Sequence, residues 1–440
     1  MTIDGYICIG CYENPENINN IKDFDKSFIS ISSLLPYEMT LQFDGCAYFR
    51  QRLVLSTLSC QSIKIKNIRS QENQPGLRDF EVSLLHLLEK LTNGSKVEIN
   101  ATGTSLYYAP GALIGGSIEH ECSLQRSIGY FLEFVLYMAP FMKTALELRL
   151  KGVTNDRDDP SVDLIKYSAI PIMKRFLGSD DGLEFKINKR GAKPNGGGEI
   201  FFRCPTKMKL RPCQWTDVGK IKRIRGVAYA MRVSPSIANR LIETAKGLLL
   251  KFLPDVYIYV DHQKGINAGL SPGYGLTLAA ETKNGTVICA ESCSIPRAEE
   301  GETTTITIPE ELAKEAVFKL LDEIYKAGVV DSFGQSLIFH YMALNQADVS
   351  KVITGPLNSY SMQYLRYLKQ FFQIMFKIEN AKELPKNVTE KMEEETNESD
   401  EEKNDDDDND DDDDELKTGS PKILLTAIGI GYHNLTKTLI

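Results

Sequence analysis

Apolar and polar positions alternate along this chain with the periods of both strands and helices. Between residues 80 and 91, leucines recur at helical spacing, and Asp79 before them is a suitable N-cap residue. The next two segments, 96–100 and 105–109, alternate as half-buried strands do. Further along, the pattern predicts strands at 145–151, 183–189 and 199–204 and a helix at 163–177. This order predicts an α/β fold of two layers, in which helices cover one face of a sheet.

A second group of elements follows residues 209–226, where Pro212, Trp215 and several basic residues interrupt the regular pattern. The group is predicted to contain a strand at 227–233, a helix from Pro235, a strand at 256–261 and a hairpin around Asn284-Gly285. From Pro309 helical spacing returns, and the last predicted elements are helices at 335–344 and 359–371 and strands at 351–354, 373–378 and 423–430. We therefore expect a compact second unit, after which the first one resumes.

Most of the negative charge lies in one segment. The chain has 51 Lys and Arg against 60 Asp and Glu, a formal net charge of −9. Residues 393–415 hold 17 acidic residues and one lysine, which leaves 50 basic against 43 acidic residues elsewhere. The acidic segment has no apolar residues and repels itself, so we expect a disordered loop there. The remainder is mildly basic, and RNA is therefore a conceivable partner.

Cysteine usage and hydropathy predict an intracellular protein. The nine cysteines form no regular framework, and Cys8 and Cys11 have no second pair at zinc-site spacing, so free thiols are expected rather than disulfides or a metal. No signal-like segment opens the chain. The longest apolar run, 128–142, contains Glu133 and Pro140 and is too short for a membrane span, so it is predicted to be a buried helix. The five histidines show no metal or triad spacing, and His86 and His340 are expected in the core.

Basic residues gather at several places, and each place has two interpretations. The triplet Gly196–Gly198, with Lys189 and Arg190 upstream, either holds a phosphate group or is a turn that joins two strands. The other clusters are either solvated faces or contacts to RNA phosphates. The candidate anion-binding residues are Arg50, Arg52, Arg78, Lys189, Arg190, Lys222, Arg223 and Arg225.

Many long segments of the chain occur together, in one order, in a known family. They include FRQRLVLSTLS (49–59), GTSLYYAPGALIGGSIEHEC (103–122), KGVTNDRDDPSVD (151–163), KRGAKPNGGGEI (189–200), GLSPGYGLTLAAET (269–282) and LRYLKQFFQIMFKIE (365–379). On these segments the chain resembles the RNA 3'-terminal phosphate cyclases, and more closely their non-cyclase branch, the cyclase-like nucleolar proteins. The resemblance runs from about residue 44 to 440, apart from the acidic loop.

The resemblance implies three related ββαβα-like units and a smaller, inserted thioredoxin-like α/β domain. The expected divisions are an N-terminal extension of uncertain structure (1–40), the first part of the core (41–212), the inserted domain (213–300), the continued core (301–385), the acidic disordered loop (386–420) and a C-terminal strand that returns to the core (421–440).

Two departures from the cyclase pattern lead us to expect no cyclase activity. The cyclases adenylate a histidine in a motif that falls on residues 331–337 here, and Ser332 occupies its expected place. A serine hydroxyl cannot replace imidazole as the nucleophile of a phosphoramidate. The cyclase glycine-rich loop becomes residues 44–47, Asp-Gly-Cys-Ala, although Arg50 still matches the family arginine. We therefore expect a residual anion pocket with no catalytic residues, no cofactor and no metal.

For the cyclase-like branch, the resemblance implies a role in ribosome biogenesis. It implies early cleavages of pre-rRNA that release the small-subunit precursor, in the nucleolus of the nucleus. The partners expected are a nucleolar GTPase, and pre-rRNA with small nucleolar ribonucleoprotein in the small-subunit processome, with no membrane. The alternative is an RNA-processing enzyme, either an endoribonuclease that cuts pre-rRNA or a residual cyclase.

The expected partner surface is the helix at 359–371. Its spacing places Met362, Leu365, Leu368 and Phe372 toward the sheet, and Arg366 and Lys369 outward. The next candidate is the basic run 220–225.

Overall fold

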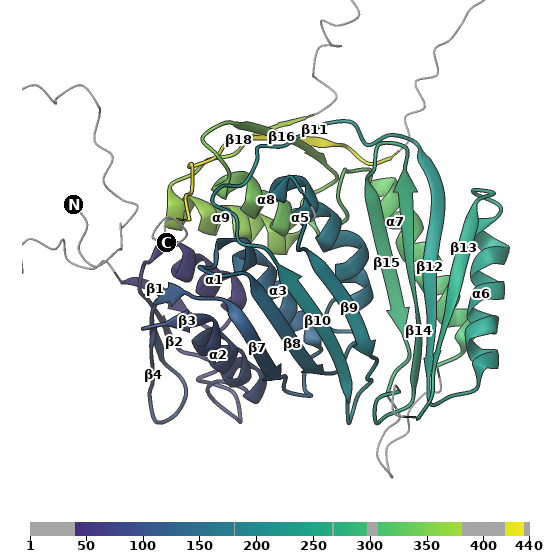
Figure 1. The fold of residues 1–440 in the computed structure, drawn as a ribbon, viewed down its shortest axis with the longest axis horizontal. Helices are drawn as coiled ribbons and strands as arrows, with labels where there is room; N and C mark the ends of the chain where they lie inside the picture. Colours follow the sequence, from purple (N-terminus) through teal and green to yellow (C-terminus); the bar gives the residue numbers. More distant parts are fainter. Residues whose placement is uncertain (1–39, 180, 266–267, 297–306, 381–418, 435–440) are drawn as a thin grey trace, which may run out of the picture.

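The structure is a computed structural model that describes residues 40–434, apart from residue 180 and the segments 266–267, 297–306 and 381–418. The expectations for residues 1–39, with Cys8 and Cys11, and for the acidic run 393–415 lie outside the described residues. The described part alternates helices and strands in several mixed sheets (Figure 1). This confirms the predicted α/β fold class.

Three four-stranded sheets share one topology. In the first, the strand order is β1-β2-β5-β4, with β1 parallel to β2 and the other neighbours antiparallel. Its elements are β1 (Leu41–Asp44), α1 (Phe49–Ser59), β2 (Ile63–Lys66), α2 (Asp79–Leu91), β4 (Lys96–Ile99) and β5 (Leu106–Ala109). The unit is therefore β-α-β-α-β-β rather than the ββαβα expected. Two short strands, β3 (Thr92–Asn93) and β6 (Ala112–Leu113), pair beside it.

The second and third units repeat this order as β7-β8-β10-β9 and β11-β16-β18-β17. The second contains β7 (Gly116–Glu121), α3 (Ile128–Met138), a 3-10 turn (Ala139–Phe141), β8 (Leu146–Gly152), α4 (Val162–Leu164), a π-helical turn (Ile165–Ala169), α5 (Ile170–Leu177), β9 (Glu184–Lys189) and β10 (Gly198–Cys204). The third contains β11 (Gln214–Trp215), α8 (Gln335–Leu344), β16 (Val349–Thr354), α9 (Ser359–Phe372), β17 (Lys377–Asn380) and β18 (Ile423–Ile428). The strand that follows the acidic segment thus lies between β16 and β17.

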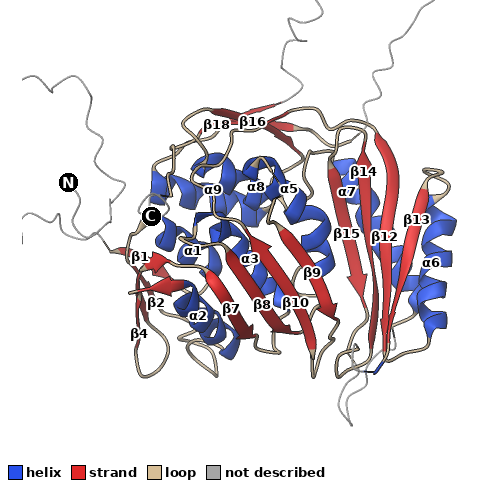
Figure 2. Cartoon of the chain, viewed as in Figure 1, coloured by secondary structure: helices blue, strands red, loops and turns tan. Residues whose placement is uncertain are grey.

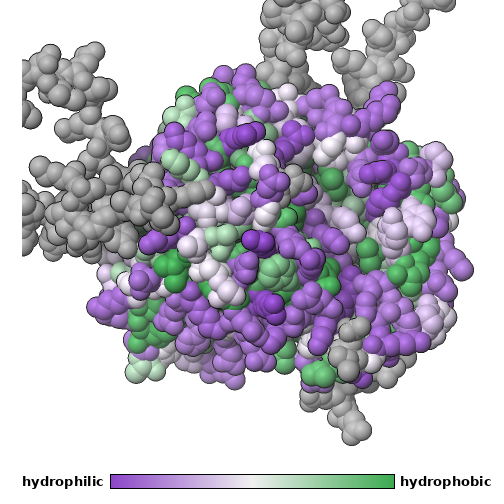
Figure 3. All heavy atoms as spheres, viewed as in Figure 1, coloured by the Kyte–Doolittle hydropathy of each residue, from purple (hydrophilic) through white to green (hydrophobic). Residues whose placement is uncertain are grey.

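The three units share one hydrophobic core. Their helices gather at the centre and their sheets lie around them (Figure 2). Every side chain of α3 is buried, including Phe131 and Phe134, so the predicted buried helix is confirmed. Hydrophilic residues cover most of the face shown in Figure 3.

The fourth sheet, ordered β13-β12-β14-β15, has a hydrophobic core of its own. Its elements are β12 (Ile221–Met231), α6 (Pro235–Leu249), β13 (Val256–Gln263), β14 (Gly273–Thr282), β15 (Val287–Cys293) and α7 (Pro309–Lys326). Leu312, Val317 and Leu320 of α7 join this core, so the division expected at residue 300 falls too early. The division expected at 213 is also early, because β11 pairs with β16 of the third unit.

Candidate functional site

Ser332 lies in the loop between α7 and α8, at the place where the resemblance puts the cyclase nucleophile. Its hydroxyl donates to Glu323 Oε1 at 2.8 Å, and its backbone N–H donates to Glu323 Oε2 at 2.7 Å. Its carbonyl oxygen accepts from Asn358 Nδ2 at 2.6 Å. Asn358 also caps α9, because its Oδ1 accepts from Ser361 N. These bonds give Ser332 a role in holding α7 and α9 together.

His340, the next histidine along the chain, is a core residue, as predicted. Its side chain is fully buried, with Nε2 2.8 Å from the carbonyl oxygen of Tyr137 and Nδ1 2.7 Å from the Tyr364 hydroxyl. Nε2 must carry the proton because a carbonyl can only accept, and Nδ1 then accepts from the tyrosine. Burial lowers the pKa of His340 to about 3. A neutral imidazole with both nitrogens occupied cannot serve as the missing nucleophile.

Asp331, beside Ser332, is a buried carboxylate that joins three segments. Its Oδ1 accepts from Ser168 Oγ at 2.9 Å and from Gly334 N at 2.8 Å, and its Oδ2 accepts from Cys289 N at 3.2 Å. Burial outweighs these donors and raises the pKa of Asp331 to about 6. Asp331 therefore fixes the Ser332 loop against the second unit and β15.

Arg50 is held in an internal ion pair. Its Nη1 lies 2.6 Å from Glu133 Oε2 of α3 and 3.0 Å from the carbonyl oxygen of Tyr130, and its guanidinium stacks 4.3 Å above the Tyr130 ring. The Tyr360 hydroxyl donates to the other Glu133 oxygen at 3.1 Å. The expectation that Arg50 faces an anion pocket is wrong, because these side chains satisfy its charge. The sequence could have indicated this ion pair, because Glu133 is an isolated charge in an apolar helix and a buried charge needs a partner.

Arg52 is also structural. It is 5% exposed, and it donates to the Tyr367 hydroxyl at 2.9 Å and to the carbonyl oxygen of Gly45 at 2.7 Å, with its guanidinium 4.7 Å from the Phe43 ring. Arg78 lies at the surface before α2 and pairs with Glu72. Arg50, Arg52 and Arg78 therefore do not converge on a single anion site.

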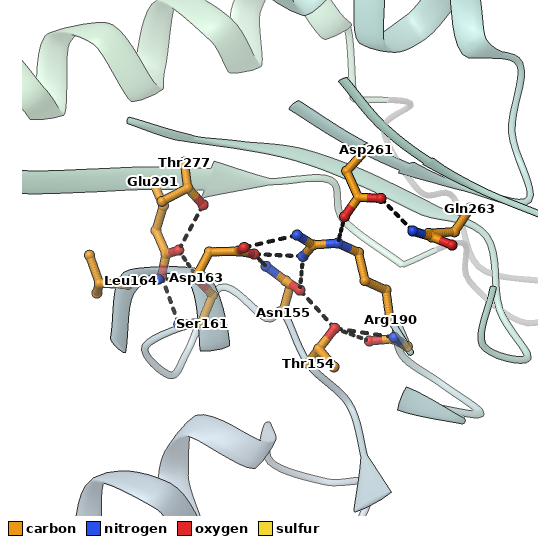
Figure 4. A network of polar contacts seen from close by, with 11 residues as sticks. Thr154, Asn155, Ser161, Asp163, Leu164, Arg190, Asp261, Gln263, Thr277 and Glu291 are labelled. Carbon is orange, nitrogen blue, oxygen red and sulfur yellow. Dashed lines mark hydrogen bonds and ion pairs between the residues drawn. The ribbon is translucent and has the colours of Figure 1, made fainter. Parts of the chain in front are cut away.

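Arg190 is the centre of a buried polar network between the second unit and the fourth sheet (Figure 4). Its side chain donates to Asp163 at 2.6 and 2.8 Å and to Asp261 of β13 at 2.5 Å. Asn155 Nδ2 also donates a hydrogen bond to Asp163 Oδ2, at 3.1 Å. Arg190 is only 3% exposed, so the interpretation of Arg190 as an anion ligand is wrong. The neighbouring Lys189 ends β9 and is half-buried.

The glycine triplet is a packed turn. The N–H of Gly196 donates to the carbonyl oxygen of Ala192 at 2.9 Å. A Cβ at Gly198 would lie 2.5 Å from the Thr154 side chain, and one at Gly197 would lie 3.0 Å from Leu270. The triplet therefore lets β10 approach these neighbours, and of its two interpretations the strand-joining turn is confirmed.

A cavity of about 300 Å³ opens beside this network, between the second unit and the β14–β15 edge. Glu291 lines it and accepts from Ser161 N at 2.8 Å, from the Ser161 hydroxyl and from Thr277 Oγ1 at 3.4 Å. Burial raises the pKa of Glu291 to about 7 in spite of these donors. Sequence reasoning missed Glu291, because its main partner, Ser161, lies 130 residues away along the chain.

Comparison of the chain with known proteins shows the family to which it belongs. A family model described as RNA 3'-terminal phosphate cyclase matches residues 41–378. The chain belongs to the RNA 3'-terminal phosphate cyclase family. It is similar to the RNA 3'-terminal phosphate cyclase-like protein of Homo sapiens, 50% identical over 91% of this chain and 98% of the relative. A probable RNA 3'-terminal phosphate cyclase-like protein of Drosophila melanogaster is 46% identical over 91% and 97%. The rRNA processing protein rcl1 of Schizosaccharomyces pombe is 43% identical over 76% and 91%.

In this member of the cyclase family, α9 presents an exposed basic pair. Arg366 and Lys369 are both exposed, and Arg366 contacts Gln363 of the same helix at 3.3 Å. Leu368 is buried as expected, but Met362 is 43% exposed, so the expectation that it faces the sheet is wrong. The outward side of α9 therefore combines two cations with an apolar side chain.

The basic run 220–225 lies at the start of β12. Arg223 pairs with Glu281 at 2.6 Å, Arg225 pairs with Asp255 at 2.8 Å, and Lys222 is exposed beside them. Of the predicted anion-binding residues, Lys222, Arg223 and Arg225 are the ones that the fold brings together at the surface.

Other expectations about chemistry concern metals, membranes and His86. Within residues 40–434 as described, no group of three metal-ligating side chains converges. No helix in the described ranges has the length and apolar character needed to cross a bilayer. His86 was expected in the core, but its side chain is 63% exposed and lies 3.2 Å from Glu89, so that expectation is wrong.

Proposed function

We propose that this member of the cyclase family is a non-cyclase factor in rRNA processing, needed for the early pre-rRNA cleavages of small-subunit (40S) maturation. One observation carries the proposal: Ser332, at the expected place of the nucleophile, donates a hydrogen bond from its hydroxyl to Glu323 and ties α7 to α9. The pairing of Arg50 with Glu133 supports it, because this ion pair engages the arginine that matches the family arginine. The name of the fission yeast relative, an rRNA processing protein, points to the same role.

The finer parts of the proposal concern partners and place. We propose action in the nucleolus, with a nucleolar GTPase, pre-rRNA and small nucleolar ribonucleoprotein in the small-subunit processome. The exposed pair Arg366 and Lys369 on α9 supports a protein partner, since arginine is frequent among the residues that dominate binding energy. Neither residue is needed by the core.

The first test asks whether the protein forms an adenylate. Purified protein is incubated with radiolabelled ATP beside an authentic RNA 3'-phosphate cyclase, and covalently bound label is measured after denaturation. We expect label on the cyclase alone. We also expect none on a Ser332→His variant, because a histidine there would still lack a free Arg50 to hold the phosphates.

A second test, in cells and with the pure protein, distinguishes the proposed function from the alternative of an RNA-processing enzyme. Cells depleted of the protein are expected to accumulate unprocessed small-subunit precursor RNA, and Ser332→Ala is expected to restore processing as well as wild type does. A stable adenylate on the wild-type protein would establish a residual cyclase. Cleavage of a pre-rRNA fragment by the pure protein would establish the endoribonuclease.

A further inference from the structure

Two tyrosines stand exposed on the edge strand of the fourth sheet. Tyr257 and Tyr259 of β13 are each 51% exposed, and their ring centroids lie 4.5 Å apart with the planes at 72°. They are two residues apart on a strand and therefore point to the same face of the sheet. Val256 precedes the two tyrosines and Ile258 lies between them. Both point to the opposite face and are buried in the core that this sheet shares with α6 and α7. The fold therefore places two large aromatic side chains in solvent where the core does not use them.

The tyrosine face is covered only in part. At its β14–β15 side, Ala279 and Cys289 pack against Leu164 and Tyr167 of the second unit. On the β12–β13 side, the second unit covers the end of the strands, where Arg190 pairs with Asp261 of β13. Tyr257 and Tyr259, which precede Asp261 on the same face, are exposed. Figure 3 shows weakly polar and apolar residues gathered over β12 and β13, with hydrophilic residues around them. The outer edge of β13 is also unpaired within the described sheet.

Cations lie beside Tyr257. Arg225 lies directly beside Tyr257 in the parallel β12–β13 register. Lys246 of α6 reaches around the edge strand, with its Nζ 5.7 Å from the Tyr257 ring. With Lys222 and Arg223 these make four cations, whereas Asp255 and Glu281 are the two carboxylates that pair with them. Positive charge next to exposed aromatic rings favours a ligand that carries several negative charges and planar aromatic groups.

We propose that this surface, formed by Tyr257, Tyr259, Lys222, Arg223, Arg225 and Lys246, binds single-stranded RNA. Unpaired bases stack on the tyrosine rings, and the cations neutralise the phosphates that run past them. Aromatic side chains on a sheet face are a recurring way to hold unpaired bases, and the stacking tolerates different sequences because every base has a flat face. This inference rests on the proposed role in rRNA processing and gives that role an RNA-contacting surface.

The test is a fluorescence anisotropy titration of the full chain with a fluorescein-labelled oligouridylate of about twelve nucleotides. We expect Tyr257→Ala with Tyr259→Ala to weaken binding by about tenfold for each ring removed. Replacement of both tyrosines by Phe retains the flat rings and is expected to retain the affinity. Tyr325→Ala is the matched control, because Tyr325 of α7 is 60% exposed and belongs to the helical layer.

Salt dependence gives a second, independent readout. Binding of a single strand weakens with salt, with a slope of about 0.7 per phosphate neutralised on logarithmic axes. We expect Lys222→Gln with Lys246→Gln to lower this slope, and the alanine pair at the tyrosines to leave it unchanged. A duplex RNA of equal length should compete poorly, since its bases are already stacked.

Several outcomes would overturn the proposal. Equal affinity of wild type and the alanine pair would do so, as would an equal loss in Tyr325→Ala. If the double variant fails to fold by circular dichroism, the single variants and the Phe pair decide by the same criteria. If the wild-type protein binds no oligouridylate, this surface is refuted, while the proposed function is judged separately by the processing of pre-rRNA in depleted cells.

Discussion

At the scale of single residues, burial decides what a basic side chain does. The run from Lys189 to Gly198 predicts cations and a strand-joining turn, and both are present. The sequence does not indicate that Arg190 pairs with Asp163 and Asp261, which lie 27 and 71 positions away. Partners at such separations come together only through the fold. The basic residues of the candidate site could thus be predicted, but which of them remain free for a ligand could not.

Arg190→Met should destabilise the fold strongly. The substitution leaves Asp163, which is 1% exposed, as an unpaired charge in the interior, and breaking a buried ion pair costs about 3–5 kcal/mol. The free energy of unfolding in urea measures this loss. Lys189→Met, at the half-buried neighbour, is the control and should change little. Equal stability of the two variants would mean that the network contributes nothing.

Glu291→Gln should flatten the dependence of stability on pH. Burial raises the pKa of Glu291 from its ordinary 4.5 to about 7, so the native state binds this proton more tightly than the unfolded state does. Wild-type stability is then lost as pH rises from about 4.5 through 7, whereas glutamine has no proton to release. Melting temperatures at pH 5 and pH 8 should show a relative gain for the variant at the higher pH.

The control for this prediction is Glu315→Gln in the same cavity. Burial opposes the charged form of Glu315, but the ion pair with Lys319 helps to outweigh it, and the pKa of Glu315 is lowered. This variant should therefore show no relative gain at pH 8. A gain in both variants would trace the effect to the cavity as a whole rather than to Glu291.

At the scale of elements, hydrophobic periodicity predicted most helices and strands. The helix at 80–91 and the strands at 96–100 and 105–109 agree with α2, β4 and β5. The N-cap prediction is wrong by one residue, because Arg78 caps α2 and Asp79 is its first helical residue. The helix expected at 163–177 exists, but it contains the π-helical turn Ile165–Ala169. Pro171 follows this turn and has no N–H to donate to the carbonyl of Tyr167, so the regular ladder is interrupted there. The ββαβα order of the units came from the resemblance rather than from periodicity, and the units instead have the order β-α-β-α-β-β. Periodicity does not report which strands pair.

Arg366→Ala on α9 should weaken binding of the nucleolar GTPase by about 2 kcal/mol or more if Arg366 is an anchor of that interface. The fold should remain intact, because Arg366 is exposed and contacts Gln363 on the surface of its own helix. Isothermal titration calorimetry measures the affinity, and Gln370→Ala, at another exposed position of α9, is the control. Equal affinity of mutant and wild type would move the interface elsewhere, with residues 220–225 the next candidate.

At the scale of the whole molecule, three similar units share a core and a fourth sheet lies in an interruption of the third unit. β11 ends at Trp215 and pairs with Val352 of β16, and the elements from β12 to α7 lie between them in the chain. The acidic segment interrupts the same unit between β17 and β18. Both long insertions therefore occur in one unit and leave the first two continuous.

Deletion of residues 393–415 should leave the melting temperature nearly unchanged. β17 and β18 are antiparallel neighbours, which a very short connection can join, so the residues that remain suffice. The cost of closing a loop changes by only about 0.6 kcal/mol for each doubling of its length. Differential scanning calorimetry of the two proteins checks this, and a fall of more than several degrees would mean that the acidic run packs on the basic body.

The position of β18 sets the order in which the molecule can be completed during translation. Chains emerge from the ribosome from the N-terminus, and domains generally fold in that order. The first two units and the fourth sheet can form while synthesis continues, but the third sheet is joined through β18, the last described strand to emerge. A nascent chain stalled within the acidic run would hold α8 and α9 without their full sheet and expose their apolar side chains to chaperones. Completion of the third sheet therefore requires that translation has passed the acidic run.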